Sequence, residues 1–226
     1  MRVVALGGRL ENDGGRSHRY VLSCVDVERP RVCLVPTASG DDEAYVAETV
    51  ATWEAYGCSV SVLRLFNREV ADLAEFIGLH DLVYAMGGNT ANLLAVWQAH
   101  DLDGVLRAAA SNGVVMAGSS AGASCWFDSC ATDSLTPGRI APLRGGVGLV
   151  QGSFCPHAGE RGRLAAYERL VMLGNLPRGY AAEDGVALRF DDGQLTEAFS
   201  TSPDAAAWRV GSLIGGASRE PIPTGE

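Results

Sequence analysis

Five short runs of apolar, mostly β-branched residues follow one another along the first half of the chain, and each predicts a buried strand. The runs are apolar at successive positions rather than at alternating ones, which is typical of strands covered on both faces. Such strands form mostly parallel sheets, so the pattern predicts an α/β layer fold. The runs are Val3–Leu6, Val32–Val35, Val60–Leu65, Leu82–Ala85 and Val114–Ala117.

Three helices are predicted from apolar residues spaced three or four positions apart. The first can be capped by Asp41 or Asp42, and the second can begin at Asn89 or Thr90. The third runs from about Arg161 to Leu173 and ends at a glycine. Helices therefore separate the predicted strands, as an α/β fold requires.

The last part of the chain predicts antiparallel strands, because short apolar runs are joined there by turn residues. No repeat, low-complexity segment or linker interrupts the sequence, so we expect a single domain over residues 1–226 with a frayed tail from about residue 218. The predicted strands are Val186–Phe190, Leu195–Phe199 and Ala206–Val210.

Composition narrows the class of protein. Of 226 residues, 47% are hydrophobic and 20% are charged, which is enough apolar material for a sizeable core and excludes disorder as the main state. No apolar stretch is long enough for a membrane span and no signal peptide is evident, so we expect a cytoplasmic protein. The net charge of −9 argues against nucleic acid and anionic membranes as partners.

All 18 basic residues are arginine, which excludes mechanisms that need a P-loop or Schiff-base lysine. No two of the six cysteines have the C-x-x-C spacing, and there are only four histidines. Reduced, buried thiols and no metal or other cofactor are therefore expected.

A nucleophile is predicted at Ser120. The segment from Gly118 to Gly122 reads G-x-S-x-G, follows a predicted buried strand and precedes a short apolar helix expected over Ala121–Phe127. This is the context of a nucleophile elbow, in which a sharp turn presents the central serine. Ser119 is the competing candidate, but the glycines bracket Ser120 symmetrically.

His157 is the best candidate for the general base that a serine nucleophile needs, because it follows Pro156 on a predicted loop. The acid that orients it is expected to be Asp133, which lies between the two in the sequence. Only 37 residues separate Ser120 from His157, which is short for an α/β-hydrolase and favours another scaffold. Four other acids stay open as rivals: Asp128, Glu160, Glu183 and Asp184.

A second glycine-rich turn, Gly87–Thr90, also follows a predicted strand and opens a helix. It lacks the spacing of a phosphate-binding loop, so we expect the N–H groups of Gly88 and Ala121 to form an oxyanion hole. Asn89 and Thr90 are then expected to border the substrate. A tight turn with an Asn or Thr helix cap is the simpler interpretation, and both can hold together.

These segments together resemble the dipeptidase E and cyanophycinase family of serine peptidases. The resemblance rests on G-G-N-T at 87–90, A-G-S-S-A-G-A at 117–123, T-D-S at 132–134 and C-P-H at 155–157, and runs from the first strand to about residue 190. It implies a three-layer α/β sandwich similar to class I glutamine amidotransferases, with a mostly parallel central sheet and a nucleophile elbow. In that family Ser120 takes the place of the nucleophile and His157 that of the base.

The resemblance implies a serine peptidase acting on small peptides, above all on dipeptides with an N-terminal Asp. Arg161 and Arg163 lie near His157 in the sequence and are the candidates for binding a substrate carboxylate. An amidase, esterase or amidotransferase-like hydrolase on the same scaffold and a non-catalytic binding protein are the alternatives. A homodimer is compatible with a sheet of this size.

Overall fold

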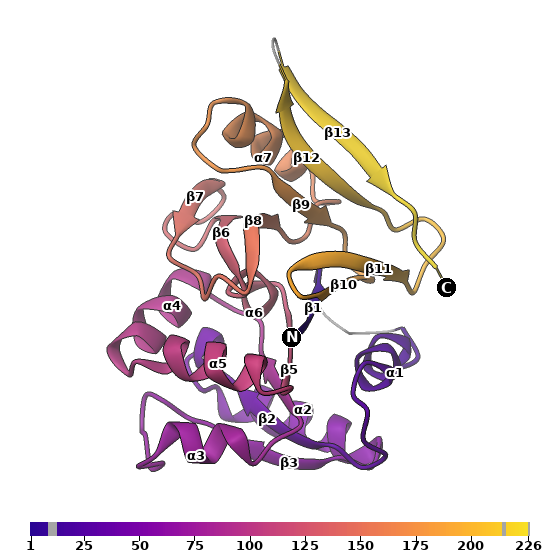
Figure 1. The fold of residues 1–226 in the computed structure, drawn as a ribbon. Helices are drawn as coiled ribbons and strands as arrows, with labels where there is room; N and C mark the ends of the chain where they lie inside the picture. The colour runs from indigo at the N-terminus through magenta and orange to yellow at the C-terminus, as the bar shows by residue number, and fades with distance from the viewer. Residues whose placement is uncertain (9–12, 214–215, 226) are drawn as a thin grey trace.

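The strands of the computed structural model, which describes residues 1–8, 13–213 and 216–225, form two sheets (Figure 1). The first sheet has seven strands in the order β11-β10-β1-β5-β4-β2-β3. Its five parallel strands lie where they were predicted, except that the third stands at the sheet edge, is only partly buried and ends at Val62 rather than Leu65. Its antiparallel strands β10 (Val186–Asp191) and β11 (Gln194–Ser200) confirm the predicted hairpin. The parallel strands are β1 (Arg2–Leu6), β2 (Arg31–Val35), β3 (Ser59–Val62), β4 (Leu82–Ala85) and β5 (Val115–Ser119).

Helices cover both faces of this sheet, because alternate residues of each strand point to opposite sides. In β1, Val4 and Leu6 pack with α1 (Arg16–Ser23) and α2 (Glu43–Ala55). Val3 and Ala5 belong to the cluster on the other face, where three further helices lie. These are α3 (Leu73–Gly78), α4 (Thr90–Ala99) and α5 (Leu102–Ser111), with the short 3-10 helix η1 (Thr37–Ser39) beside α4.

The second sheet has six strands in the order β13-β12-β9-β8-β6-β7. Its β6 and β8 contribute Phe127 and Phe154 to the large core cluster that also contains residues of β1 and β5, and the ring of Phe127 meets that of Phe190 edge to face at 5.5 Å. The two sheets therefore share a core, with α7 (Arg163–Met172) packed on β12 and β13. The strands are β6 (Phe127–Thr132), β7 (Ala141–Arg144), β8 (Val150–Cys155), β9 (Gly179–Ala182), β12 (Ala207–Leu213) and β13 (Gly216–Ile222).

Two expectations from the sequence are corrected here. The helix expected over Ala121–Phe127 is the shorter α6 (Ala121–Ser124), because Phe127 already begins β6 and packs in the shared core. Residues 218–222 of the tail expected to fray belong to β13, which pairs residue by residue with β12. An edge strand is held by backbone hydrogen bonds to its neighbour and needs little burial. The polar residues of β13 therefore give no apolar pattern from which a strand could be predicted. The hairpin formed by β12 and β13 lies at the top of Figure 1.

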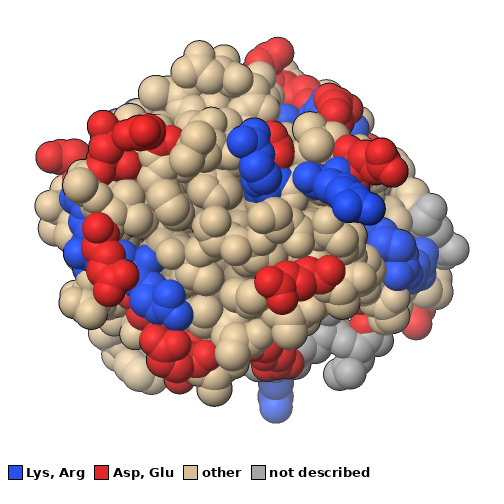
Figure 2. Space-filling view, turned by 90° about the horizontal axis from the view of Figure 1, so that it is seen from below, with Lys and Arg blue, Asp and Glu red and all other residues tan. Residues whose placement is uncertain are grey.

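Acidic and basic side chains are interspersed on the face shown in Figure 2, where neither sign forms a continuous patch. Ion pairs such as Arg31 to Asp81 at 3.0 Å and Arg107 to Asp103 at 2.8 Å show the same local balance. Within the described residues, no helix is both long and apolar enough to cross a membrane.

Candidate active site

A sharp turn presents Ser120 at the carboxyl end of β5. The strand is buried throughout, and Ser120 adopts φ 55° and ψ −111° before α6 begins. A non-glycine residue held there stores about 1–3 kcal/mol of strain, which the surrounding packing must offset. Gly118 and Gly122 allow the turn because a Cβ on either would lie about 2 Å from a backbone oxygen, 2.2 Å at Gly118 and 2.0 Å at Gly122. The G-x-S-x-G spacing is therefore a steric requirement of this elbow.

A chain of hydrogen bonds runs from Ser120 to a carboxylate. The hydroxyl of Ser120 lies 2.7 Å from Nε2 of His157, and Nδ1 of His157 lies 2.6 Å from Oδ1 of Asp184. His157 is held in place by its own backbone, since it adopts φ 53° and its N–H donates to the carbonyl of Gly7 at 2.7 Å. The arrangement has the distances and order of a nucleophile, a base and an orienting acid.

Asp184 reaches His157 from the turn between β9 and β10, where the chain passes from the second sheet to the first. Gly8, just after β1, lies directly against this pair: a Cβ there would come 1.6 Å from Oδ1 of Asp184 and 3.0 Å from Nδ1 of His157. The lack of a side chain at Gly8 therefore makes room for the His157–Asp184 contact. The Gly7-Gly8 pair after the first strand is a signal in the sequence that could have pointed to this site.

The prediction that Asp133 orients His157 is wrong, because Asp133 lies beside Arg163 and His157 contacts Asp184. The carboxylate of Asp133 lies 3.6 Å from Nη2 of Arg163, at the start of α7. The other rival acids also have different partners. Asp128 accepts from the Gly152 N–H, Glu160 pairs with Arg163 at 2.9 Å, and Glu183 accepts from the Ala206 N–H.

The turn Gly87–Thr90 lies beside Ser120, as expected. Gly88 has φ 146° and packs so closely on η1 that a Cβ would come 2.1 Å from the carbonyl of Ala38. In the described part of the chain, the backbone N–H groups of Gly88 and Ala121 have no acceptor within the protein. Both donors are thus free for a ligand on Ser120.

Asn89 and Thr90, expected to border the substrate, are engaged in holding this turn. The Asn89 side chain accepts from the Asn92 N–H as the N-cap of α4 and donates to the carbonyl of Ser134 at 3.0 Å. The N–H of Thr90 donates to the Ser134 hydroxyl at 2.9 Å. Thr90 also lines the cavity beside Ser120, whereas the cavity lining does not include Asn89. The helix-cap interpretation is confirmed for Asn89, whereas Thr90 is the first residue of α4.

A small cavity of about 230 Å³ opens in front of Ser120 and His157. Among its walls, Arg163 is the buried charged residue, with 7% of its surface exposed, and its guanidinium is flanked by the more exposed Asp133 and Glu160. Arg161 is exposed and is not part of the cavity wall. The lining is almost entirely polar and offers charges of both signs. Its residues are Gly88, Thr90, Ser120, Thr132, Asp133, Pro156, His157, Glu160 and Arg163.

The buried thiols do not compete with Ser120. Cys125, one helical turn beyond it, is completely buried, and burial raises the pKa of its thiol well above the ordinary value. Burial likewise raises the pKa of Cys130 and Cys155 to about 12. These groups stay protonated at neutral pH and are poor nucleophiles. Over residues 1–8, 13–213 and 216–225, no group of three or more His, Cys, Asp or Glu side chains is arranged to hold a metal ion.

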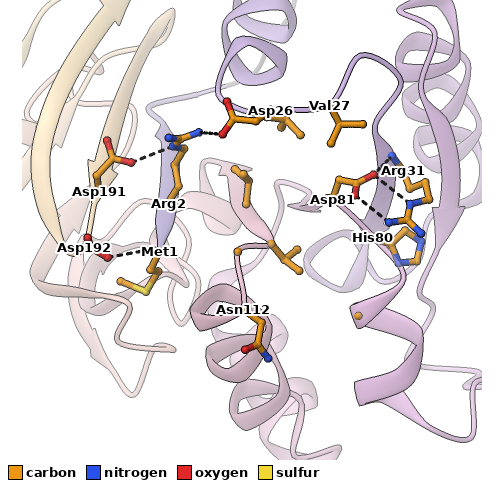
Figure 3. Close-up of a pocket in the computed structure, with 15 residues that line it drawn as sticks. Met1, Arg2, Asp26, Val27, Arg31, His80, Asp81, Asn112, Asp191 and Asp192 are labelled. Atoms are coloured by element: carbon orange, nitrogen blue, oxygen red, sulfur yellow. Dashed lines mark hydrogen bonds and ion pairs between the residues drawn. The ribbon is translucent and has the colours of Figure 1, made fainter.

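A larger hollow of about 570 Å³ lies at the opposite, amino-terminal ends of the parallel strands (Figure 3). Its labelled charges pair with one another: Arg2 with Asp191 at 3.0 Å, and the amino group of Met1 with Asp192 at 2.9 Å. Ligands of parallel sheets bind at the carboxyl ends of the strands, which is where Ser120 lies. The smaller cavity is therefore the candidate active site.

Comparison with known proteins identifies a family model and a similar sequence. Residues 3–198 match the family model of Peptidase family S51. A Bacillus subtilis (strain 168) protein described as uncharacterized peptidase YgaJ is 42% identical over 213 residues, which covers 92% of this chain and 91% of that protein.

Two solved structures share the fold. A peptidase from an acI-B1 actinobacterium superposes with a TM-score of 0.71 and 17% identity, covering 100% of this chain and 95% of its own. A putative peptidase E protein from Listeria monocytogenes EGD-e superposes with a TM-score of 0.67 and 16% identity, covering 89% of this chain and 98% of its own.

Proposed function

The chain belongs to peptidase family S51 and is a serine-type peptidase, and from this premise we propose that it hydrolyses dipeptides beginning with Asp through an acyl-enzyme on Ser120. The observation that carries the proposal is the continuous contact from the Ser120 hydroxyl through His157 to Asp184, at 2.7 and 2.6 Å. Such a relay raises the nucleophilicity of a hydroxyl that is otherwise too weakly acidic to attack an amide.

In the acylation step, the Ser120 oxygen attacks the carbonyl carbon of the peptide bond while its proton passes to Nε2 of His157. Asp184 accepts the hydrogen bond from Nδ1–H and stabilises the imidazolium that forms. The carbonyl oxygen becomes an oxyanion and accepts hydrogen bonds from the Gly88 and Ala121 amides. His157 then gives its proton to the leaving amine as the C–N bond breaks.

In the deacylation step, His157 takes a proton from water, and the resulting hydroxide attacks the acyl carbon. The same two amides hold the second oxyanion. When that intermediate collapses, the proton returns from His157 to the Ser120 oxygen and the N-terminal amino acid leaves as a carboxylic acid. Apart from this water, the groups that act in the cycle belong to the protein or the substrate.

Preference for an N-terminal Asp is assigned to Arg163. The cavity of about 230 Å³ suits a small substrate, and this guanidinium forms part of its wall. A planar guanidinium binds a carboxylate bidentately. Its contact with Asp133 is 3.6 Å, longer than a hydrogen bond, so a substrate carboxylate can take that position.

The substrate preference is tested with a panel containing Asp-Leu, Asn-Leu, Glu-Leu and Ala-Leu. We expect Asp-Leu to have the highest kcat/KM, and Arg163→Gln to lower that value by about 10- to 100-fold, the size of a lost charge-assisted contact. Asn-Leu should be affected much less. Arg161→Gln is the matched control, because it removes an exposed arginine outside the cavity wall.

Equal kcat/KM values for Asp-Leu and Asn-Leu in the unsubstituted protein would contradict the Asp preference and leave the peptidase itself intact. Hydrolysis of simple amides or esters without any of the dipeptides would favour the amidase or esterase alternative.

Metal removal should leave turnover unchanged. Because the nucleophile and base are both side chains of this protein, incubation with EDTA followed by desalting should alter the rate of dipeptide hydrolysis by less than about 2-fold. Loss of activity that returns on adding a divalent cation would contradict the acyl-enzyme route.

A further inference from the structure

The turn that carries Gly88 is fixed on two sides. On the first side it packs on η1 and on the end of β2: the Asn89 N–H donates to the Ala38 carbonyl at 2.8 Å, and the Met86 N–H donates to the Val35 carbonyl at 3.1 Å. These hydrogen bonds fix the position of the turn relative to η1 and the end of β2. These two hydrogen bonds do not involve Thr90, where the turn ends and α4 starts.

Ser134 fixes that end from 44 residues away. Its hydroxyl accepts from the N–H of Thr90 at 2.9 Å, and its carbonyl accepts from Nδ2 of Asn89 at 3.0 Å. The first N–H groups of a helix have no partner within the helix, so the Ser134 hydroxyl satisfies one of them as a cap supplied by a distant segment. A single residue thus holds both positions that follow Gly88.

Ser134 is itself held by Thr132, the last residue of β6. The two hydroxyls lie 2.7 Å apart, and the Ser134 N–H donates to the Thr132 oxygen at 3.1 Å. Thr132 is only 4% exposed, so this support is anchored in the second sheet. The connection therefore runs from β6 through Thr132 and Ser134 to the turn beside Ser120.

We propose that Ser134, supported by Thr132, is a positioning residue that aims the Gly88 N–H at the developing oxyanion on Ser120. This inference rests on the proposed acyl-enzyme mechanism. An oxyanion donor must lie within about 2.7–3.1 Å of the charge that develops, and a small displacement of the donor weakens the transition state more than the bound substrate. Ser134 touches neither substrate nor reacting atoms and acts only through the turn.

The test is steady-state kinetics of Ser134→Ala with the best dipeptide of the panel. We expect kcat to fall by about 10- to 100-fold, part of the loss seen when an oxyanion donor is removed, and KM to change by less than about 3-fold. A peptide boronic acid, which forms a tetrahedral adduct with an active serine, should bind more weakly by a similar factor. Ser134→Thr, which keeps the hydroxyl, should restore most of both values.

Ser129→Ala is the matched control, since it removes another serine whose hydroxyl bonds a backbone carbonyl, from the same strand as Thr132. It should leave kcat and boronate affinity unchanged. Thr132→Val provides a second variant, expected to change both in the same direction as Ser134→Ala by a smaller factor.

The inference is overturned if Ser134→Ala keeps the kcat and boronate affinity of the unsubstituted protein. It is equally overturned if Ser129→Ala loses as much as Ser134→Ala, or if KM and kcat fall together without rescue by Ser134→Thr. Failure of the mechanism looks different, because the unsubstituted protein would then hydrolyse no dipeptide and bind no boronate.

Discussion

Asp184→Asn is expected to lower kcat for dipeptide hydrolysis by about 10³- to 10⁴-fold, the loss typical of an orienting acid replaced by its amide. The amide can donate a hydrogen bond to Nδ1 of His157, which would favour the tautomer with its proton on the nitrogen that should accept from Ser120. It also removes the charge that stabilises the imidazolium. Asp184 is the carboxylate in contact with His157, at 2.6 Å. Activity and thermal unfolding are measured on the same preparation, so that loss of chemistry is separated from loss of fold.

Asp133→Asn is the matched control for Asp184→Asn. The Asp133 carboxylate is 43% exposed and lies 3.6 Å from Arg163, so we expect a change of no more than about 10-fold, mostly in KM. If Asp133→Asn instead lost most of kcat while Asp184→Asn kept it, the assignment of Asp184 would be wrong and Asp133 would take the orienting role.

Ser120→Ala is expected to reduce kcat by about 10⁶-fold, because the mechanism has no second nucleophile. A fluorophosphonate probe should label the unsubstituted protein at Ser120, as shown by peptide mass mapping, and should leave the variant unlabelled. The adjacent Ser119→Ala provides the control, since Ser119 is 2% exposed and the hydroxyl that His157 contacts belongs to Ser120.

Labelling that persisted in Ser120→Ala, or that moved to Ser119, would contradict the elbow assignment. Absence of labelling together with absence of dipeptide hydrolysis in the unsubstituted protein would favour a binding protein that retains the pocket.

Local patterns were sufficient to predict the parallel strands and to single out Ser120 and His157. A run of apolar residues specifies a buried strand wherever it lies, and the glycines around Ser120 reflect contacts with Gly122 and Ala85 that any such elbow requires. His157 could be chosen because few histidines compete with it and because Pro156 places it on a loop. In these cases the information lies within a few residues of the feature.

Asp184 could only be left as one of several rivals, because its place depends on pairings far along the chain. The turn that carries it is set by β9, parallel to β8, and by β10, antiparallel to β1, with Leu6 opposite Ala187. Neither register can be read from the sequence around Asp184. The strand β13 was missed for a related reason, since its partner β12 determines it more than its own polar residues do.

The passage of the chain between the two sheets at Asp184 has a consequence for folding. Ser120 follows a strand of the first sheet, His157 follows a strand of the second, and Asp184 stands in the turn that joins them. Each sheet can acquire its hydrogen-bonded strands while the three side chains are still apart. Enzymatic activity therefore reports the docking of one sheet on the other, and during refolding it should return with the final consolidation of the shared core rather than with the recovery of secondary structure.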